Sequence, residues 1–319
     1  MIITVTPNPV LDHTLTVPAI AFDTVTRATA VRDDWGGKGF NVARVLLTLG
    51  VESTALGFIG GATGQRLAAG LASLGLPTDF VTIAGETRTN VIITEAQSGR
   101  YIKVNAAGPT VRPDEIALCL DKVRQRATPG DIWALCGSLP PGVPADFYAQ
   151  VIRLLQPHGI RVLLDTSGAA LHLGVNAHPF LVKPNADEAA AFVGQPVETR
   201  DAALRAAQVF LECGVTEVAL SLGVQGLLLA TRDAAVLAVP PDVPVKNVTG
   251  AGDALLAGLA YALERDLPLV EQARWGVAAG TASAMHEGVG IVTRESVEQV
   301  YTQVQTAEHV NVSTLKRNF

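Results

Sequence analysis

The sequence predicts an α/β protein, with a doubly wound, mostly parallel sheet and a small β-sheet lid in a single domain over residues 1–319. Two observations predict this class. From residue 113 onward, short apolar runs of strand length alternate with longer segments of helical periodicity, which is typical of parallel sheets covered by helices. Before that point, a hairpin with one polar and one apolar face does not fit such a sheet. We therefore assign the lid to about residues 10–35 and 87–106.

The composition excludes several classes of protein. Hydrophobic residues make up 48% of the 319 and charged residues 17%, so the chain is globular and not disordered. The formal net charge of −6 argues against nucleic acid as a general partner. A strand-like run directly after Met1 leaves no room for a signal peptide, and no apolar run reaches the ~18 residues that span a membrane. The three dispersed cysteines lack C-x-x-C spacing, so we expect a reduced, cytoplasmic protein with no membrane partner.

The N-terminal segment predicts two strands around a turn. Residues 2–6 form the first strand, residues 6–9 (Thr-Pro-Asn-Pro) form the turn, and residues 10–17 alternate as an exposed edge strand does. Asp12 in the second strand is suited to accept hydrogen bonds from sugar hydroxyls. Taken alone, a solvated acid beside a turn is the more ordinary interpretation.

A glycine-rich loop at residues 36–41 leads into a helix that ends at Gly50. Its lysine stands between glycines and no Gly-Lys-Ser/Thr follows, so it is not a Walker loop. It also lacks the G-x-G-x-x-G pattern after a strand, which argues against a nicotinamide dehydrogenase. The loop offers bare backbone at Gly37, a cation at Lys38 and an amide at Asn41, all at the start of a helix.

Residues 88–105 give the clearest hairpin, after a strand at 51–60, a helix at 63–74 and a strand at 80–84. A two-residue turn at 98–99 places residue 94 opposite 103 and residue 92 opposite 105. One face is then apolar, with Val91, Ile93, Ile102 and Val104. The other is polar and partly cationic, as expected of a flap over a polar ligand, and carries Arg88, Asn90, Thr94, Lys103 and Asn105.

The β/α alternation then places polar residues at the carboxyl ends of strands, where ligands bind in such sheets. We expect strands at 132–136, 160–165, 180–183 and 218–222, and helices at 113–126 and 147–155, with a last helix at 295–307. The polar residues that follow these strands are Ser138, Asp165, Asn185, Glu188, Ser221 and Gly223.

Residues 247–258 carry the strongest chemical signal. Gly250, Ala251 and Gly252 leave backbone N–H groups accessible at the start of a helix, whose dipole favours an anion there. Asp253 follows directly and is placed to take a proton from an alcohol. An anion hole beside a base is what transfer of a phosphoryl group to a hydroxyl requires. The alternative is that Asp253 only caps the helix.

Four motifs in this order resemble the ribokinase superfamily of sugar kinases, the PfkB type, over essentially the full length. They are residues 36–41 (GGKGFN), 183–188 (KPNADE), 221–226 (SLGVQG) and 249–253 (TGAGD). The opening residues 4–9 with Asp12 are similar to the hexose-phosphate branch, which contains 1-phosphofructokinase and tagatose-6-phosphate kinase. In the fourth motif many members carry Asp where this chain has Asn247.

The resemblance implies a ribokinase-like fold, a kinase that uses ATP and Mg²⁺, and a set of site residues. Asp253 would be the base, with the N–H groups of residues 250–252 as the anion hole, and a K⁺ ion near residues 247–249 and the loop after Met285 is expected. A homodimer through the apolar lid face is also expected. For ATP the implied residues are Lys183, Asn185, Ser221, Gly223, Gly226, Gly250 and Gly252, and for the metal Asn185 and Glu188. For the sugar they are Asp12, Gly37 and Asn41, to which we add Asn90, Asn105 and Ser138, and the cations Arg27, Lys38, Arg88 and Lys103 for a substrate phosphate.

The leading hypothesis is therefore phosphorylation of a ketohexose monophosphate to the bisphosphate. A kinase for an unphosphorylated sugar or nucleoside is an alternative within the same fold. A sugar-phosphate-binding protein without catalysis is an alternative of another class, and the intact Asp253 disfavours it. Which hexose phosphate is used stays open, because a furanose presents similar groups in its 1- and 6-phosphates.

Overall fold

A ten-stranded sheet forms the centre of the body in this computed structural model, which describes residues 1–286 and 292–310. Its strand order is β14-β13-β12-β11-β10-β9-β8-β1-β4-β5; the strands from β11 to β5 are parallel and β12, β13 and β14 are antiparallel. The strands are β1 (Ile2–Thr6), β4 (Ser53–Ile59), β5 (Val81–Thr82), β8 (Ile132–Cys136), β9 (Arg161–Asp165), β10 (Leu181–Val182), β11 (Glu217–Ser221), β12 (Leu227–Ala230), β13 (Ala235–Val239) and β14 (Gln305–Val310).

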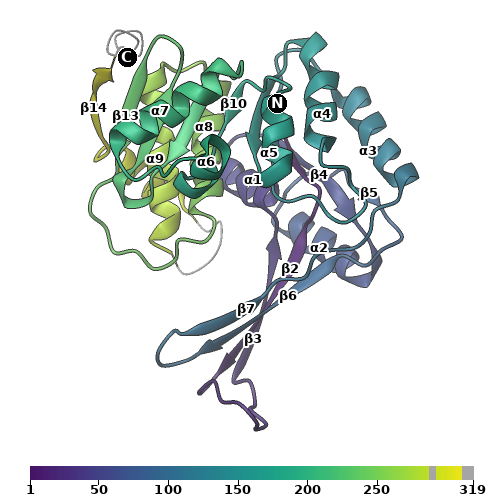
Figure 1. Cartoon of the computed structure of the whole chain (residues 1–319). Coiled ribbons are helices and arrows are strands. Elements are labelled where there is room, and N and C mark those ends of the chain that lie inside the picture. Colours follow the sequence, from purple (N-terminus) through teal and green to yellow (C-terminus); the bar gives the residue numbers. More distant parts are fainter. Residues whose placement is uncertain (287–291, 311–319) are drawn as a thin grey trace.

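Helices cover both faces of this sheet (Figure 1), which confirms the predicted doubly wound fold. One apolar core joins the sheet to α3 (Pro113–Arg126), α4 (Phe147–Leu155), α5 (Gly168–Val175), α6 (Ala186–Val193) and α7 (Arg200–Glu212). On the other face lie α1 (Lys38–Thr48), α2 (Gly61–Ser73), α8 (Ala251–Glu264), α9 (Leu269–Ala284) and α10 (Arg294–Tyr301). In the described part of the chain, no helix is long and apolar enough to cross a membrane.

A separate four-stranded sheet extends away from the body (Figure 1). Its order is β3-β2-β6-β7, formed by β2 (Val10–Val17), β3 (Ala30–Gly36), β6 (Arg88–Glu95) and β7 (Tyr101–Val104). We predicted β2 as an exposed edge strand, and this is wrong. β2 pairs antiparallel with β3 and parallel with β6, so it lies inside the sheet. Alternation of apolar and polar residues reports the two faces of a strand and not its edges, which explains the error.

The predicted register of the β6–β7 hairpin is also wrong, by two residues. Ile92 lies opposite Lys103 and Thr94 opposite Tyr101, and the N–H of Glu95 donates to the carbonyl of Arg100. The loop is therefore residues 96–99. The Glu95 carboxylate accepts hydrogen bonds from the Ile20 N–H at 2.7 Å and from the Arg100 guanidinium, which holds the longer loop in place.

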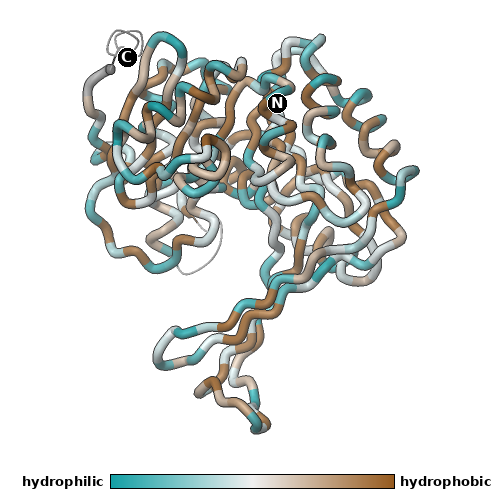
Figure 2. Tube along the Cα trace, viewed as in Figure 1, coloured by the Kyte–Doolittle hydropathy of each residue, from teal (hydrophilic) through white to brown (hydrophobic). Residues whose placement is uncertain are grey.

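A shift of two residues keeps every side chain on its predicted face. Val91 lies opposite Val104 and Ile93 opposite Ile102, so the apolar face is as predicted. Hydrophobic segments follow these strands along the extended sheet (Figure 2). The exposed fraction is 37% for Val91, 38% for Ile102 and 61% for Val104, so the body of this chain does not cover that face.

The last predicted helix is too long. It ends at Tyr301, and β14 begins at Gln305 and pairs antiparallel with β13. The segment 304–306 reads Val-Gln-Thr, and its two β-branched residues favour a strand once an open sheet edge is available.

The chain order places a ligand crevice beside β1. After β1 the chain builds β4 and β5 on one side, and it later returns to build β8 and β9 on the other side. The reversal lies between β1 and β8, and ligands of such sheets bind beyond the carboxyl ends of the strands at this point. The segments that follow β1, β8, β9, β10 and β11 therefore meet at one edge of the sheet.

Candidate active site

Asp253 lies in the first turn of α8, directly above this edge. Gly250 precedes the helix with φ 83°, a left-handed conformation that favours glycine. Only 6% of Asp253 is exposed. A Cβ atom at position 252 would lie 3.4 Å from the Lys183 Nζ atom, so the small residue lets the lysine approach the start of the helix. The first turn thus combines accessible backbone N–H groups, a helix dipole and a buried carboxylate.

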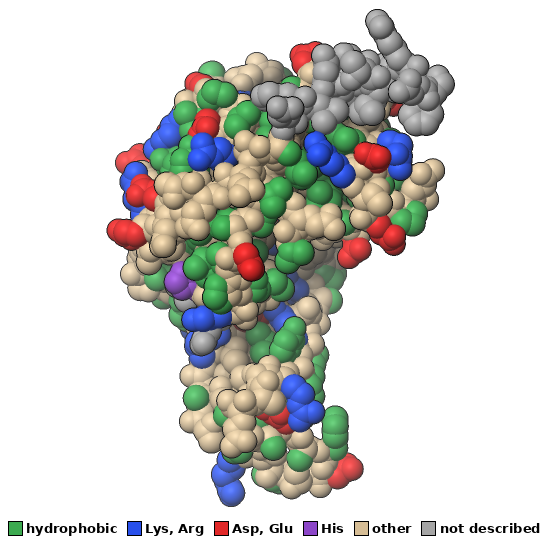
Figure 3. Space-filling view, turned by 90° about the vertical axis from the view of Figure 1, so that its left-hand side faces the viewer, with side chains coloured by type: hydrophobic (Ala, Val, Ile, Leu, Met, Phe, Trp, Pro, Cys, Tyr) green, Lys and Arg blue, Asp and Glu red, His purple; other side chains and the backbone are tan. Residues whose placement is uncertain are grey.

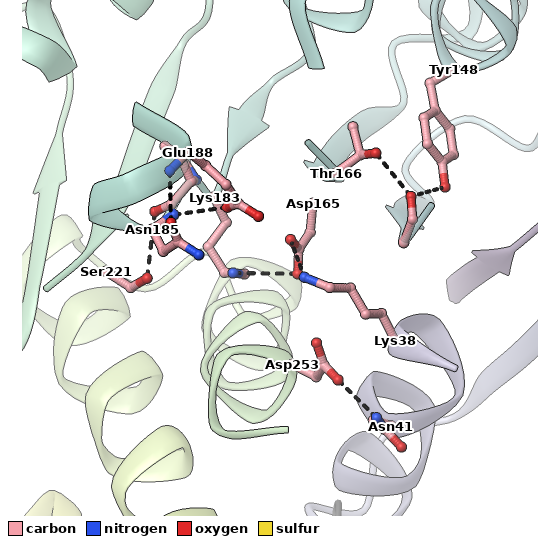
Figure 4. A network of polar contacts seen from close by, with 12 residues as sticks. Lys38, Asn41, Tyr148, Asp165, Thr166, Lys183, Asn185, Glu188, Ser221 and Asp253 are labelled. Carbon is pink, nitrogen blue, oxygen red and sulfur yellow. Dashed lines mark hydrogen bonds and ion pairs between the residues drawn. The ribbon is translucent and has the colours of Figure 1, made fainter. Parts of the chain in front are cut away.

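The buried carboxylate is held from α1. Asn41 Nδ2 donates a 2.8 Å hydrogen bond to Asp253 Oδ2 (Figure 4). We predicted Asn41 for sugar hydroxyls; in the structure its amide nitrogen bonds the predicted base. This hydrogen bond engages the Oδ2 atom of the carboxylate and does not involve Oδ1.

A second buried carboxylate joins two lysines next to the base. Asp165, at the end of β9, is fully buried; its Oδ1 lies 2.9 Å from Lys38 Nζ and its Oδ2 lies 3.3 Å from Lys183 Nζ (Figure 4). Lys38 is the first residue of α1, and Lys183 follows β10. Three different elements therefore bring two cations and one anion together beside Asp253.

Burial and the neighbouring charges shift the pKa values of Asp253, Asp165 and Lys38. Burial raises the pKa of Asp253 to about 6, although Lys38 and the hydrogen bond from Asn41 act to lower it. Burial would also raise the pKa of Asp165, yet Lys183 and Lys38 lower it below its ordinary value. Burial lowers the pKa of Lys38, but Asp165 and Asp253 together raise it above its ordinary value. At neutral pH the group therefore holds an ionised Asp165, a charged Lys38 and a mostly ionised Asp253.

A cleft of about 230 Å³ opens at the β1–β8 crevice. It includes Lys38 and Arg88, two of the four predicted phosphate-binding cations, and Ser138 and Gly37 from the predicted sugar site. Figure 3 shows Lys and Arg side chains near the narrow region between the body and the extended sheet. The lining residues are Thr6, Asn8, Gly37, Lys38, Arg88, Cys136, Gly137, Ser138, Thr166, Ser167 and Glu188.

Arg88 also connects separate segments of the chain by hydrogen bonds. Its guanidinium donates to the carbonyls of Ala106 at 2.8 Å, Asn8 at 2.9 Å and Pro9 at 3.4 Å. These bonds join β6 to the segment after β1 and to the end of the hairpin. Of the five N–H donors of a guanidinium, two stay available for a ligand.

Other predicted substrate residues form a cluster on the polar face of the extended sheet. Asn90 donates to Asp12 Oδ1 at 2.8 Å, and Lys103 Nζ lies 3.7 Å from the same oxygen. Asn105 is exposed in the segment after β7. Arg27 is exposed in the connection between β2 and β3, away from the cleft lining. The structure thus divides the four predicted cations, with Lys38 and Arg88 in the cleft and Lys103 and Arg27 outside it.

The predicted metal and nucleotide residues lie at the ends of β10 and β11. Asn185 Oδ1 accepts from the Glu188 N–H at 2.8 Å, and Glu188 Oε2 accepts from the Asn185 N–H at 3.0 Å, so the pair caps α6. Glu188 also lines the cleft. Ser221 packs on this segment through its N–H, which donates to the Pro184 carbonyl. Gly223 and Gly226 form a tight turn after β11, with φ 59° and 98°.

The loop predicted for a monovalent ion is only partly described. The N–H groups of Lys246 and Asn247 both donate to the Ala284 carbonyl, so this loop lies against the end of α9. We expected residues 286–290 to supply carbonyl oxygens; of these only His286 is described, and residues 287–290 lie outside the described residues.

A second, more open depression of about 360 Å³ lies between α6 and residues 194–198. It is larger than the crevice cleft, but its lining contains no lysine, arginine or histidine, and neither Asp253 nor Asp165 contributes to it. The charges needed for chemistry therefore favour the smaller cleft.

Sequence reasoning missed six of the residues that line the cleft, among them Thr6, Asn8 and Thr166, and it missed the place of Asp165 in the charged group. Thr6 and Asn8 belong to a segment that we interpreted only as a turn, and Thr166 follows a strand end at which we noted Asp165 without a role. Their position in the sequence could have identified them, because every residue directly after a central parallel strand is a candidate ligand contact.

Comparison with known proteins places this geometry in a family. The model of the "pfkB family carbohydrate kinase" matches residues 6–295. The 1-phosphofructokinase of Rhodobacter capsulatus is 38% identical over 278 residues, which cover 87% of this chain and 88% of that protein. Phosphofructokinase-2 from Escherichia coli is 33% identical in two solved structures that cover 95% of this chain and 98% of that one; its complex with potassium has a TM-score of 0.91 and its complex with fructose-6-phosphate a TM-score of 0.88. This chain belongs to the PfkB family of carbohydrate kinases.

Proposed function

We propose that this kinase transfers the γ-phosphoryl group of ATP to a hydroxyl of a ketohexose monophosphate and forms the bisphosphate in the cytoplasm. The candidate substrates are fructose 1-phosphate, fructose 6-phosphate and tagatose 6-phosphate. The observation that carries the proposal is a cleft lined by two cations, Lys38 and Arg88, beside a buried base. One cation fits a transferred phosphoryl group, and a second fits a phosphate already present on the sugar.

The chemistry follows from the charged group. Asp253 Oδ1 would accept the proton of the attacking hydroxyl, and the N–H groups at the start of α8 would face the developing negative charge. Lys38 and Lys183 add positive charge there, and Asp165 holds both. Phosphoryl transfer depends mainly on such positioning and charge stabilisation.

The second phosphate would lie among Arg88, Asn8 and Ser138. Asn8 Nδ2 lies 3.3 Å from Ser138 Oγ, and the Asn8 carbonyl accepts from Arg88, so the three residues form one wall of the cleft. Two guanidinium donors and a hydroxyl suit a phosphate, which accepts several hydrogen bonds. Lys103 and Asp12 on the polar face of the extended sheet, which we propose is the lid, would contact sugar hydroxyls when it closes.

A direct assay tests the proposal. ATP turnover is measured against fructose 1-phosphate, fructose 6-phosphate, tagatose 6-phosphate and ribose at matched concentrations. We expect kcat/KM for one phosphorylated ketohexose to exceed the value for ribose by at least about 100-fold, which is the ~3 kcal/mol of charged hydrogen bonds lost with the phosphate. Equal or better turnover of ribose would support the alternative of an unphosphorylated substrate.

Glu188 fits a Mg²⁺ ion bound to ATP. Mg²⁺ in such sites is held by one or two carboxylates together with phosphate oxygens and water, and Glu188 Oε1 is one such oxygen at the edge of the cleft. The ion supplies charge neutralisation for the phosphates. Asn185 supports Glu188 by fixing the start of α6.

The pH dependence of kcat/KM should report the protonation of Asp253. Only the carboxylate can accept a proton, so kcat/KM is expected to fall as the pH decreases through about 6. Asn41→Ala removes a hydrogen bond that lowers the pKa of Asp253, so this acidic limb should move to higher pH. A sugar phosphate also titrates near pH 6, but its titration is the same for both proteins, so only the difference between them is diagnostic. An acidic limb that does not move in Asn41→Ala contradicts the assignment of the base.

We also propose that a monovalent cation such as K⁺ binds between residues 247–249 and the end of α9. The support is the contact of this loop with Ala284 and the potassium complex of the similar phosphofructokinase-2. Turnover is expected to be higher in KCl than in NaCl or tetramethylammonium chloride at equal ionic strength. Identical rates in the three salts would exclude the ion.

The apolar lid face supports a homodimer. Val91, Ile93, Ile102 and Val104 form this face, and it is not covered by the body. A four-stranded sheet needs a covered apolar face for stability, and a second copy packed about a two-fold axis covers it while leaving the polar face free. We therefore propose that two copies associate through their lids.

Ile93→Asp with Val104→Asp is expected to yield monomers, because each substitution places a charge in a contact whose burial contributes roughly 1.5–3 kcal/mol per side chain. Light scattering at micromolar concentration measures the mass. Val209→Asp with Leu118→Asp, at exposed positions on α7 and α3, is the control and should leave the mass unchanged. A monomeric wild type, or a dimeric lid variant, would show that the lids are not the interface.

A further inference from the structure

The carbonyl of the peptide bond between Gly137 and Ser138 accepts two hydrogen bonds, and the preceding peptide is held through the Gly137 N–H. The Gly137 carbonyl accepts one hydrogen bond from Tyr148 Oη at 2.9 Å and another from Thr166 Oγ1 at 2.8 Å (Figure 4). The Gly137 N–H donates to the Asp165 carbonyl at 2.8 Å. Gly137 has φ 95°, a left-handed conformation that a side chain would disfavour. Elements α4 and β9 therefore set the orientation of the loop after β8.

This orientation determines where the Ser138 N–H points. In a trans peptide the carbonyl and the following N–H point in opposite directions, and the structure contains no cis peptide bond in its described residues. The N–H of Ser138 therefore points away from the two hydroxyls. Among the described residues, this N–H donates no hydrogen bond. Ser138 is exposed and lines the cleft together with Asn8 and Arg88.

Both lone pairs of the Gly137 carbonyl are occupied by hydroxyls of residues that are themselves buried. One donor is enough to satisfy a buried carbonyl, and Tyr148, which is fully buried, also needs an acceptor for its own hydroxyl. A second donor from Thr166, on a different segment of the chain, further restricts rotation of the peptide. Fixed backbone N–H groups of this kind are effective partners of phosphate oxygens, because they need no reorganisation when the anion binds.

We propose that Tyr148 and Thr166 are positioning residues that hold the Ser138 N–H toward the phosphate group of the sugar-phosphate substrate. The inference rests on the proposed function and identifies one backbone donor for the phosphate that Arg88 and Asn8 also face. Neither hydroxyl touches the substrate through this role; both act through the Gly137–Ser138 peptide.

The test uses the two hydroxyls separately and together. Tyr148→Phe and Thr166→Val each leave one donor on the carbonyl, so each is expected to raise KM for the sugar phosphate by only about 2–3-fold. The double variant frees the peptide and is expected to raise this KM by about 10-fold or more, beyond the product of the single effects. KM for ATP and kcat should stay within about 2-fold of wild type. Thr166→Ser keeps the hydroxyl, so its KM for the sugar phosphate should equal that of the wild type and not that of Thr166→Val.

Two substitutions serve as matched controls. Among the described residues, neither the Tyr261 hydroxyl nor the buried Thr4 hydroxyl makes a hydrogen bond. Tyr261→Phe removes the hydroxyl of a tyrosine that is only 6% exposed, and Thr4→Val removes the hydroxyl of a fully buried threonine. Neither residue lines the cleft, and both variants should keep the wild-type KM for the sugar phosphate.

The outcomes separate this inference from the function on which it rests. If the wild type turns over no sugar phosphate, the proposed function fails. If the wild type is active but the double variant keeps its KM, or loses affinity for ATP equally, the positioning role is overturned. Should the double variant not fold, Thr166→Val decides: a KM for the sugar phosphate equal to that of Thr4→Val overturns the inference, and a rise that Thr166→Ser reverses supports it.

Discussion

Asp253→Asn should lower kcat by roughly 10²–10⁴-fold while ATP and sugar phosphate bind with near wild-type affinity, the usual contribution of a positioned base. The substitution keeps the shape of the side chain, and the new amide can turn its oxygen toward Asn41 Nδ2 and so preserve that hydrogen bond. What it removes is the ability to accept a proton at pH values above about 6, where Asp253 is ionised. Steady-state kinetics and calorimetric titration with ATP separate turnover from binding.

Asp201→Asn is the matched control for this substitution. Asp201 also lies in the first turn of a helix, α7, but it is exposed and does not line the cleft. We expect its kcat to equal that of the wild type. Turnover of Asp253→Asn within a few-fold of the wild type would show that Asp253 only caps α8, which is the alternative that the sequence left open.

Asp165→Ala should lower the free energy of unfolding by about 3–5 kcal/mol. Removing one partner of a buried ion pair leaves the other charge without compensation in a poorly solvated site, and that penalty is of this size. Here the residue left behind is Lys183, which is 3% exposed, and Lys38 loses the same partner. Denaturant unfolding followed by circular dichroism measures the change, with ligand absent so that lost binding does not contribute.

Asp266→Asn provides the comparison, because Asn tolerates the left-handed backbone that Asp266 adopts at φ 49°. Asp266 pairs with Arg161 at 2.8 Å, but its side chain is 82% exposed. Exposed pairs contribute about 0–1 kcal/mol, so this variant should unfold almost as the wild type does. Equal losses in the two variants would mean that the Asp165 group contributes no more to the fold than a surface ion pair.

The sequence predicts the fold class because the spacing of apolar residues distinguishes helices from strands. The bounds of α3, α4 and β8 agree with the predicted ranges 113–126, 147–155 and 132–136. The two helices have apolar residues at helical spacing and β8 is a continuous apolar run, and each segment has a clear turn or proline beside it, so local pattern and tertiary packing agree. The faces of the lid hairpin are also as predicted, since alternation is a property of the strand itself.

Structural properties that depend on a partner elsewhere in the chain are harder to predict from the sequence. The position of β2 inside its sheet depends on its parallel pairing with β6, almost eighty residues away in the sequence, which no local pattern contains. The hairpin register depends on a loop held by Glu95, whose partner Ile20 belongs to a different connection. In the site, the motifs predicted Asp253 and Lys38 one by one, but not that Asn41 would bond the base or that Asp165 would join two lysines.

Only one residue separates a strand of the extended sheet from α1, the helix whose Asn41 bonds the proposed base, Asp253. β3 ends at Gly36 and α1 begins at Lys38, with Gly37 between them at φ 140°. Lys38 and Asn41, which contact Asp165 and Asp253, lie in the first turn of that helix. Whatever fixes the lid therefore also constrains the groups that set the proton affinity of Asp253. In the proposed dimer, association through this sheet and protonation of Asp253 would be thermodynamically linked. Protein concentration would then act on the acidic limb of the rate profile, and pH on the degree of association, by the same free energy.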